Sequence, residues 1–494
     1  MSSRPIGDIT TVIDLASRNA QDDFFFPIQS NNSWFHRDPT TIFPANTASQ
    51  EFTHKGTAAW GGRLTFELGA LTAGDLLQSA VLQIRLGHWY SDSILAQLAT
   101  ASIVVDSSDA WTYMNSLGTA IIDYAEFEVG DQTLERIDGE FIKLYSSLLP
   151  NMNMLFGLTT DAGGITSLAN VATNSGALNP NRAFPTQDGV YFCLLPFFFM
   201  RTRGKEVFPL VSTAEGSVRI HVQLRPFADC VRSCTGQRMS CTDSPLSKTV
   251  HFRSTQTDAS FNYVTPSLPP PFQDFRVLTY TGLIGGEPRS AYIHKPLEQM
   301  SRFVTSFHFD EPYTYLTSKS NASSDTIEVS LPLELNHPCQ EILWVFRRKA
   351  VQINNEWGNF TPIVETQYNP LAVPEPWLAY ATLRVNGLVV EQADGEWWRQ
   401  SIAKVHRGGW SSWAAYTYGY SFALQPDNHQ PTGSINMSRA SSVRLDLRVK
   451  VPKGVAVPDG FNADVGQGWE VFVYAIHLNW IRFENGICQK IFDS

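Results

Sequence analysis

Charged residues, cysteines and long apolar runs are all scarce in this chain. Asp, Glu, Lys and Arg make up 17% of the 494 residues, whereas apolar residues make up 43%. That balance excludes a disordered chain and predicts folded domains with large buried cores. No stretch approaches the roughly 18 apolar residues that a membrane helix needs. The N-terminus lacks the basic and apolar regions of a signal peptide, so we expect a soluble protein.

Clusters of positive charge are absent as well. The formal net charge is −10, and the Lys and Arg residues are scattered along the sequence. Because binding to nucleic acid phosphates needs clustered cations, we predict no direct contact between this chain and nucleic acid.

The six cysteines are too few for a disulfide scaffold. Cys230, Cys234 and Cys241 lie close together in the sequence, but they form no CxxC pair and have no fourth ligand nearby. A structural zinc site needs four such ligands. We therefore predict free thiols in a loop and no metal site.

Sequence signatures of catalysis are also missing. The patterns GxxxxGK, HExxH and GxSxG do not occur. We predict no catalytic residue, no enzymatic activity and no cofactor. Four Asn-x-Ser/Thr sequons are candidate glycosylation sites, and Asn321 has the Ser- and Asn-rich surroundings of an exposed loop. The four acceptors would be Asn321, Asn359, Asn31 and Asn436.

What the chain does contain is a recurring alternation of apolar and polar residues, which is typical of strands with one buried face. Such stretches are 80–86, 125–129, 218–224 and 443–449. The run 471–483 is apolar on nearly both faces, as in a central strand. Helical signals are few. A short helix is predicted after Asp8. A second is predicted after Asp138, with Phe141, Ile142, Tyr145 and Leu148 buried.

An internal repeat divides the chain. Residues 125–143 align without gaps with 381–399, at numbers that differ by 256, and six of nineteen positions are identical. Residues 217–220 likewise match 442–445, at a difference of 225. One β module therefore occurs twice. For so many short strands, two packed antiparallel sheets in each copy is the economical arrangement. We predict a mainly β protein of two tandem eight-stranded jelly-roll sandwiches with long loops and a few short helices.

The proline-rich segment 267–272 is predicted to be an extended linker between the two copies. A chain of this length exceeds what one core supports. We predict the following division: an N-terminal arm at 1–27, a first jelly roll at 28–228, a linker and loop region at 229–274, and a second jelly roll at 275–494.

Both copies contain Asp-Gly-Glu, at 138–140 and 394–396. Paired acids could serve a glycosidase. Alternatively, the Asp caps a helix and the Glu lies at the positive end of the helix dipole. The apolar residues that follow at helical spacing favour the helix start.

The run 421–439, SFALQPDNHQPTGSINMSR, resembles a characteristic segment of the major capsid proteins of nucleocytoplasmic large DNA viruses. The residues that carry this motif are Phe422, Pro426, Gln430, Pro431, Gly433, Asn436, Ser438 and Arg439. Residues 195–199 with 208–210, the strand region 115–130 and the ending 473–482 are similar to further regions of the same family. At Gly130-Asp131 the family often has two glycines, and the N-terminal region matches only loosely.

The resemblance implies a double jelly roll that assembles as a homotrimer. Two similar modules in each of three chains form a pseudo-hexagonal capsomer that can tile an icosahedral virus shell. It implies a structural protein of the virion, assembled in the host cytoplasm. Its implied partners are neighbouring capsomers, minor capsid and penton proteins, and an internal viral membrane near the N-terminal arm.

Two alternatives remain open at this point. A carbohydrate-binding or carbohydrate-active double β-sandwich could stack sugars on Trp397, Trp398, Trp410 and Trp413, although these side chains are also typical of core or interface packing. A minor capsid paralogue with the same fold is the second alternative, and copy number in the particle distinguishes it.

Overall fold

The structure is a computed structural model. It describes residues 45–69, 74–87, 103–105, 111–113, 117–148, 189–202, 206–213, 217–233, 250–254, 261–264, 272–311, 326–349, 357–361, 376–406, 416–450 and 469–492. The chain divides into two compact units, Met1–Ala45 and Asn46–Ser494. The elements below belong to the second unit, apart from the first residue of β1. The predicted N-terminal arm and the helix after Asp8 lie outside the described residues.

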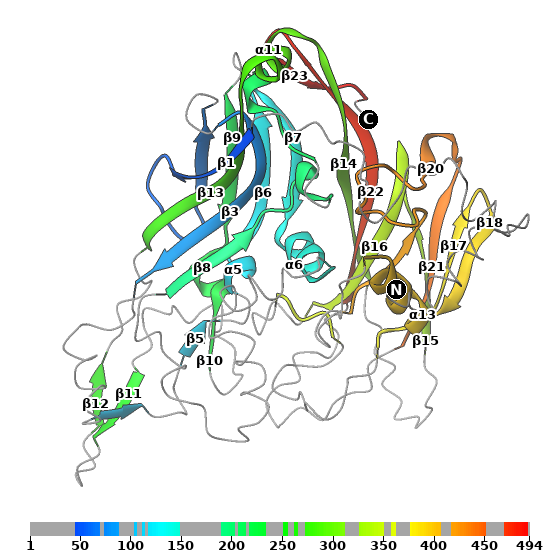
Figure 1. The fold of residues 1–494 in the computed structure, drawn as a ribbon. Coiled ribbons are helices and arrows are strands. Elements are labelled where there is room, and N and C mark those ends of the chain that lie inside the picture. The colour runs from blue at the N-terminus through cyan, green and yellow to red at the C-terminus, as the bar shows by residue number, and fades with distance from the viewer. Residues whose placement is uncertain are drawn as a thin grey trace, which may run out of the picture. The chain divides into compact units, whose positions relative to one another are not determined.

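The first sandwich consists of two four-stranded antiparallel sheets (Figure 1). One has the order β1-β13-β3-β8, formed by Ala45–Thr53, Phe272–Ile284, Leu76–Leu86 and Gly189–Leu194. The other has the order β2-β9-β6-β7, formed by Arg63–Leu68, Val218–Leu224, Ile122–Val129 and Gln132–Asp138.

The second sandwich repeats this plan. One sheet has the order β14-β22-β16-β19, formed by Leu297–Glu311, Trp469–Glu484, Pro338–Arg348 and Tyr418–Ser421, and it is extended by β20 (Ile435–Asn436) and β23 (Ile487–Lys490). The other has the order β15-β21-β17-β18, formed by Thr326–Pro332, Val443–Lys450, Leu378–Val385 and Leu388–Asp394.

Short elements connect or flank the sheets. The small strands are β4 (Ile103–Val105), β5 (Trp111–Tyr113), β10 (Val231–Ser233), β11 (Val250–Ser254) and β12 (Phe261–Val264). The helices are α5 (Leu117–Ala120), α6 (Gly139–Leu148), α11 (Gly286–His294) and α13 (Gly395–His406), with 3-10 turns η1 (Phe198–Met200), η2 (Leu210–Thr213), η3 (Phe227–Cys230) and η6 (Met437–Arg439). In the part of the chain that the structure describes, no helix is long and apolar enough to cross a membrane.

In both sandwiches the eight strands follow one another in the same chain order. The first, eighth, third and sixth strands form one sheet, and the second, seventh, fourth and fifth form the other. This is the jelly-roll topology, so the predicted fold class is confirmed. The repeat is also confirmed, because β6-β7-α6 and β17-β18-α13 start at residues that differ by 256. Even the β-bulge between Phe127 and Glu128 recurs between Leu383 and Arg384.

The position of β13 changes the proposed domain division. β13 follows the proline-rich segment but pairs with β3, so it is the eighth strand of the first sandwich. A boundary at residue 275 would cut this strand. The reason is topological: the last strand of a jelly roll inserts between the first and third strands, so the chain has to return to the first sheet. We therefore propose that the two sandwiches are joined at α11.

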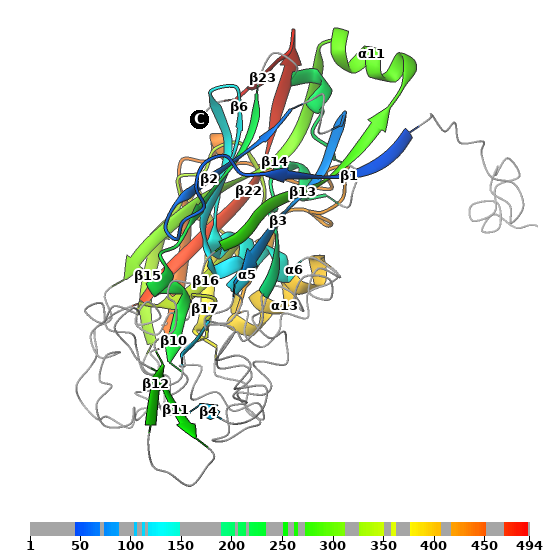
Figure 2. The same cartoon turned by 90° about the vertical axis from the view of Figure 1, so that its left-hand side faces the viewer.

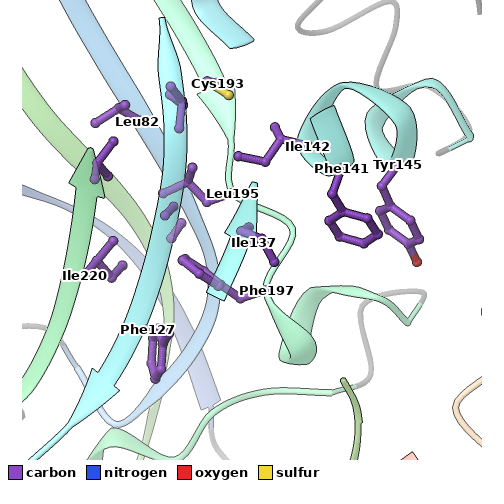
Figure 3. Packing of buried hydrophobic residues seen from close by; sticks show 14 of the residues in the cluster. Leu82, Phe127, Ile137, Phe141, Ile142, Tyr145, Cys193, Leu195, Phe197 and Ile220 are labelled. Atoms are coloured by element: carbon purple, nitrogen blue, oxygen red, sulfur yellow. The ribbon is translucent and has the colours of Figure 1, made fainter. Parts of the chain in front are cut away.

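The cores follow the alternation that the sequence predicted. Leu82, Phe127 and Ile220 are fully buried between the sheets of the first sandwich, and Figure 3 shows this interior. Trp344 and Val473 are likewise fully buried in the core of the second sandwich. α6 begins where predicted and buries its four expected side chains, Phe141, Ile142, Tyr145 and Leu148. β22 is buried over its first eleven residues, as expected of a central strand.

Candidate functional site

The junction between the two sandwiches is the most highly charged buried region in the described part of the molecule. β7, α6 and η1 of the first sandwich lie against the outer face of β14-β22-β16 (Figure 1). Aromatic rings form part of the contact: Phe141 packs on Tyr474 at 5.1 Å between ring centroids, and Phe198 stacks on Phe303 at 4.8 Å.

Arg347 lies at the centre of one buried ion-pair group. Its Nη1 donates to Glu140 Oε1 at 2.6 Å, and its Nε donates to Glu470 Oε1 at 2.5 Å. Arg225 also donates to Glu140, at 2.9 Å. Burial alone would raise the pKa of Glu140, but the two guanidinium groups hold this pKa at about 2. The group therefore stays ionised, and each charge depends on its partners.

Two further arginines bind across the junction. Arg201 donates to Glu135 Oε1 at 2.6 Å and to the carbonyl oxygen of Arg302 at 2.7 Å. Arg302 donates to Glu206 Oε1 at 2.5 Å and to the carbonyl oxygen of Pro426 at 2.9 Å. Burial raises the pKa of Glu206 to about 7, with the arginines opposing the shift. The sequence analysis missed this network, because a strand pattern does not reveal which distant residue will neutralise a buried charge.

The repeated Asp-Gly-Glu is a helix start in both copies. The backbone N–H of Phe141 donates to Asp138 Oδ1 at 2.6 Å, and that of Trp397 donates to Asp394 Oδ1 at 2.9 Å. The helix-cap interpretation is therefore confirmed. In the first copy, the Tyr474 hydroxyl also donates to Asp138 at 2.9 Å. Burial and the neighbouring Glu140 raise the pKa of Asp138 to about 6.

The motif segment 421–439 is anchored by its backbone. The N–H of Phe422 donates to the carbonyl oxygen of Gln340 at 2.7 Å, and the carbonyl oxygen of Pro426 accepts from Arg302. A Cβ at Gly433 would lie 2.5 Å from the carbonyl oxygen of Phe422, which explains a glycine there. Asn436 caps η6 by accepting from the N–H of Ser438 at 3.1 Å.

The remaining motif residues contribute less to packing. The N–H of His337 donates to Ser438 Oγ at 2.9 Å, which ties η6 to the start of β16. Gln430 and Arg439 are exposed, and Pro431 is half-buried. The structure thus assigns the motif to holding a loop against the second sandwich and the junction, rather than to a catalytic centre.

The candidate glycosylation sites differ in accessibility. Asn359 is only 5% exposed, and its Oδ1 accepts from the N–H and the hydroxyl of Thr361 at 3.0 and 2.6 Å. It is therefore inaccessible to modification in the folded protein. Asn436 is exposed, although its side-chain oxygen caps η6. Asn31 and Asn321 lie outside the described residues.

The cysteines within the described residues are free thiols and all are buried. They are Cys193, Cys230, Cys339 and Cys488. Cys230 ends η3 and is fully buried in the same core as Phe227, rather than lying in an open loop. Burial raises the pKa of Cys193 to about 12, which suppresses thiolate reactivity. Cys234 and Cys241 lie outside the described residues.

The two candidate sugar-stacking tryptophans that the structure describes, Trp397 and Trp398, do not form a sugar-binding platform. Trp398 is fully buried and packs on Trp344 at 5.4 Å, whereas Trp397 is partly exposed. Trp410 and Trp413 lie outside the described residues.

Elsewhere, His308, Asp310 and Glu470 bring three potential metal ligands together. Arg347 and Lys349 already bind these carboxylates, so protein cations occupy them.

His477, on β22, makes the folded protein sensitive to acid. Burial, aided by nearby His337, lowers the pKa of His477 to about 3. The folded protein keeps this ring neutral, whereas the unfolded chain protonates it below about pH 6.5. The stability it contributes is thus present above pH 6.5 and is lost as the pH falls toward 3.

We expect urea unfolding to show this loss. Between pH 7 and pH 4 the wild-type free energy of unfolding should fall by about 3 kcal/mol more than that of His477→Gln. His429→Gln, at an exposed histidine, should follow the wild type. Equal acid sensitivity of His477→Gln and wild type would contradict the assignment.

Comparison with known families gives the identity of this fold. Residues 39–263 match the family described as the major capsid protein N-terminus, and residues 306–488 match the large eukaryotic DNA virus major capsid protein. The two matches cover most of both sandwiches. The chain belongs to the major capsid protein family of large eukaryotic DNA viruses. It is a structural component of a virion capsid, not an enzyme.

Individual members of the capsid family are distant in sequence. The major capsid protein of Phaeocystis pouchetii virus is 22% identical, over 89% of this chain and 91% of that protein. That of Pyramimonas orientalis virus is 21% identical, over 89% and 88%. The PBCV-1 virus capsid structure superposes with a TM-score of 0.64 at 15% identity, over 94% of this chain and 100% of that one. The Faustovirus major capsid protein gives 0.62 at 12% identity, over 97% of each. At such low identity, the two structures support the fold of this capsid protein.

Proposed function

We propose that this chain is the main shell subunit of its virus and works as a homotrimer. The observation that carries the proposal is the strand-by-strand equivalence of the two sandwiches within one chain. Three such chains around a threefold axis present six similar modules, and a pseudo-hexagonal block of this kind tiles a lattice with copies of one protein. The trimers would form the faces of an icosahedral shell.

The proposal includes further partners. Neighbouring capsomers would contact the sides of the trimer, and penton and minor capsid proteins would complete the shell. The N-terminal arm at 1–27 would face minor capsid proteins or an internal membrane. The scattered cations and the net charge of −10 support a shell that does not bind nucleic acid directly.

Light scattering over a dilution series tests the trimer. We expect the purified protein to have the mass of three chains of 55.2 kDa each. A chain that stays monomeric at all concentrations, although folded, would contradict the proposal. Counting copies in purified particles separates a major shell protein from a minor paralogue, since only the former should be the most abundant capsid chain.

A further inference from the structure

The equivalence of the two sandwiches extends to single residues. The bulge where β13 pairs with β3 leaves Gln78 with no opposite residue on β13, and the bulge where β22 pairs with β16 leaves Gln340 with none on β22. When the two bulges are superposed, β3 aligns with β16 over its full length, and equivalent residues have numbers that differ by 262. It also aligns β13 with β22, at numbers that differ by 196. α6 and α13 already align through the 256-residue repeat.

Within one chain, the α6 surface of the first sandwich docks on the β16–β22 surface of the second. The docking is held by Arg347, which bridges Glu140 on α6 and Glu470 on β22. Next to it, Phe141 of α6 packs on Tyr474 of β22. All of these side chains are buried.

The same charges occur at the equivalent positions, of which two are exposed and the third, Asp274, is half-buried and paired with Arg276. Glu140 corresponds to Glu396 on α13, Arg347 to Arg85 on β3, and Glu470 to Asp274 on β13. The register agrees as well, because Arg85 pairs opposite Asp274 just as Arg347 pairs opposite Glu470. Glu396 and Arg85 are both exposed, and among the described residues Glu396 binds within α13 alone, to Arg399 and Gln400.

Apolar residues accompany these charges on both surfaces. Phe141 corresponds to Trp397, which is 40% exposed, and Tyr474 corresponds to Leu278, which is half-buried. Large exposed apolar side chains gather on the same elements, namely Leu388 (74%), Val389 (46%) and Tyr280 (50%). Figure 2 shows β1, β13 and β3 together on the side turned to the viewer. Exposed apolar surface of this kind marks an interaction site.

We propose that the β18–α13 surface of one chain docks on the outer face of β3 and β13 of a second copy, with Glu396 bound to Arg85 and Trp397 packed on Leu278. The occupant is a second copy because each chain buries one α6-type surface and one β16–β22-type surface internally and leaves one of each at least partly exposed, with Val81 and Gln83 on β3 already covered. Contacts of this head-to-tail kind close into a ring when the rotation fits. The inference rests on the proposed trimer and specifies its interface.

Charge reversal tests this interface. We expect Glu396→Arg and Arg85→Glu each to raise the concentration at which the trimer half-dissociates by at least tenfold. The double variant, which restores opposite charges, should return to within about threefold of the wild type. Glu328→Arg is the matched control: Glu328 is an exposed acid that binds Arg448, and it lies on β15, at the opposite edge of the β15-β21-β17-β18 sheet from β18, so this variant should stay trimeric.

The outcomes separate the interface from the trimer itself. A wild-type trimer that both single reversals leave unaffected overturns the interface and leaves the proposed function intact. A wild-type chain that never trimerises overturns both. If the charge variants do not fold, a double variant with both Leu278→Cys and Trp397→Cys in each chain tests the same docking. Oxidation should link these chains into covalent trimers, and a product that stays single-chain would overturn the proposed docking.

Discussion

Replacing Arg347 with alanine should lower the free energy of unfolding by about 3–5 kcal/mol. The side chain is buried and is the shared partner of Glu140 and Glu470. Its removal would leave two buried carboxylates with reduced compensation, and the cost of desolvating them would no longer be offset by a nearby positive charge. Urea or thermal unfolding of the purified protein measures the difference.

Arg384→Ala provides the matched control for this prediction. Arg384 also binds a carboxylate, that of Asp446 at 2.9 Å, but it is 40% exposed in its side chain. An exposed ion pair contributes about 0–1 kcal/mol, so this variant should unfold almost like the wild type. If both arginine variants lose the same small amount of stability, the junction does not depend on the charge of Arg347.

Gly139→Ala and Gly395→Ala should each destabilise the protein by about 3 kcal/mol or more. A methyl group at Gly139 would overlap the carbonyl oxygen of Ile122, and one at Gly395 would overlap that of Leu378. In an open helix the same change usually stabilises, because alanine restricts the unfolded chain. The expected sign is therefore opposite to that of an ordinary helical glycine.

Gly285→Ala is the control for the glycine variants. No atom lies within 4 Å of the added methyl group, and the φ of −123° suits any residue. We expect a change within about 0.5 kcal/mol. Stability close to wild type for Gly139→Ala would show that α6 can move away from β6, and would refute the close-contact explanation of the repeated glycine.

Much of the fold could be predicted because its signals are local. The alternation in 218–224 specifies a strand with one buried face, and Asp138 specifies a helix start through a contact three residues away. The repeat predicted two similar modules before their strands were placed. The predicted boundary at residue 275 did not anticipate that β13 pairs with a strand almost 200 residues earlier, because no local pattern encodes that partner.

The sequence by itself determined that one β module occurs twice, that each copy carries a capped helix at its Asp-Gly-Glu, and that the chain resembles the large DNA virus capsid proteins. Only the tertiary structure decided which copy of each matching pair is buried. Phe141 and Trp397 are similar residues in equivalent places, yet the first is fully buried and the second is 40% exposed. Burial depends on what packs against a surface, and in this chain the second sandwich covers α6 whereas its own α13 surface is left for another partner.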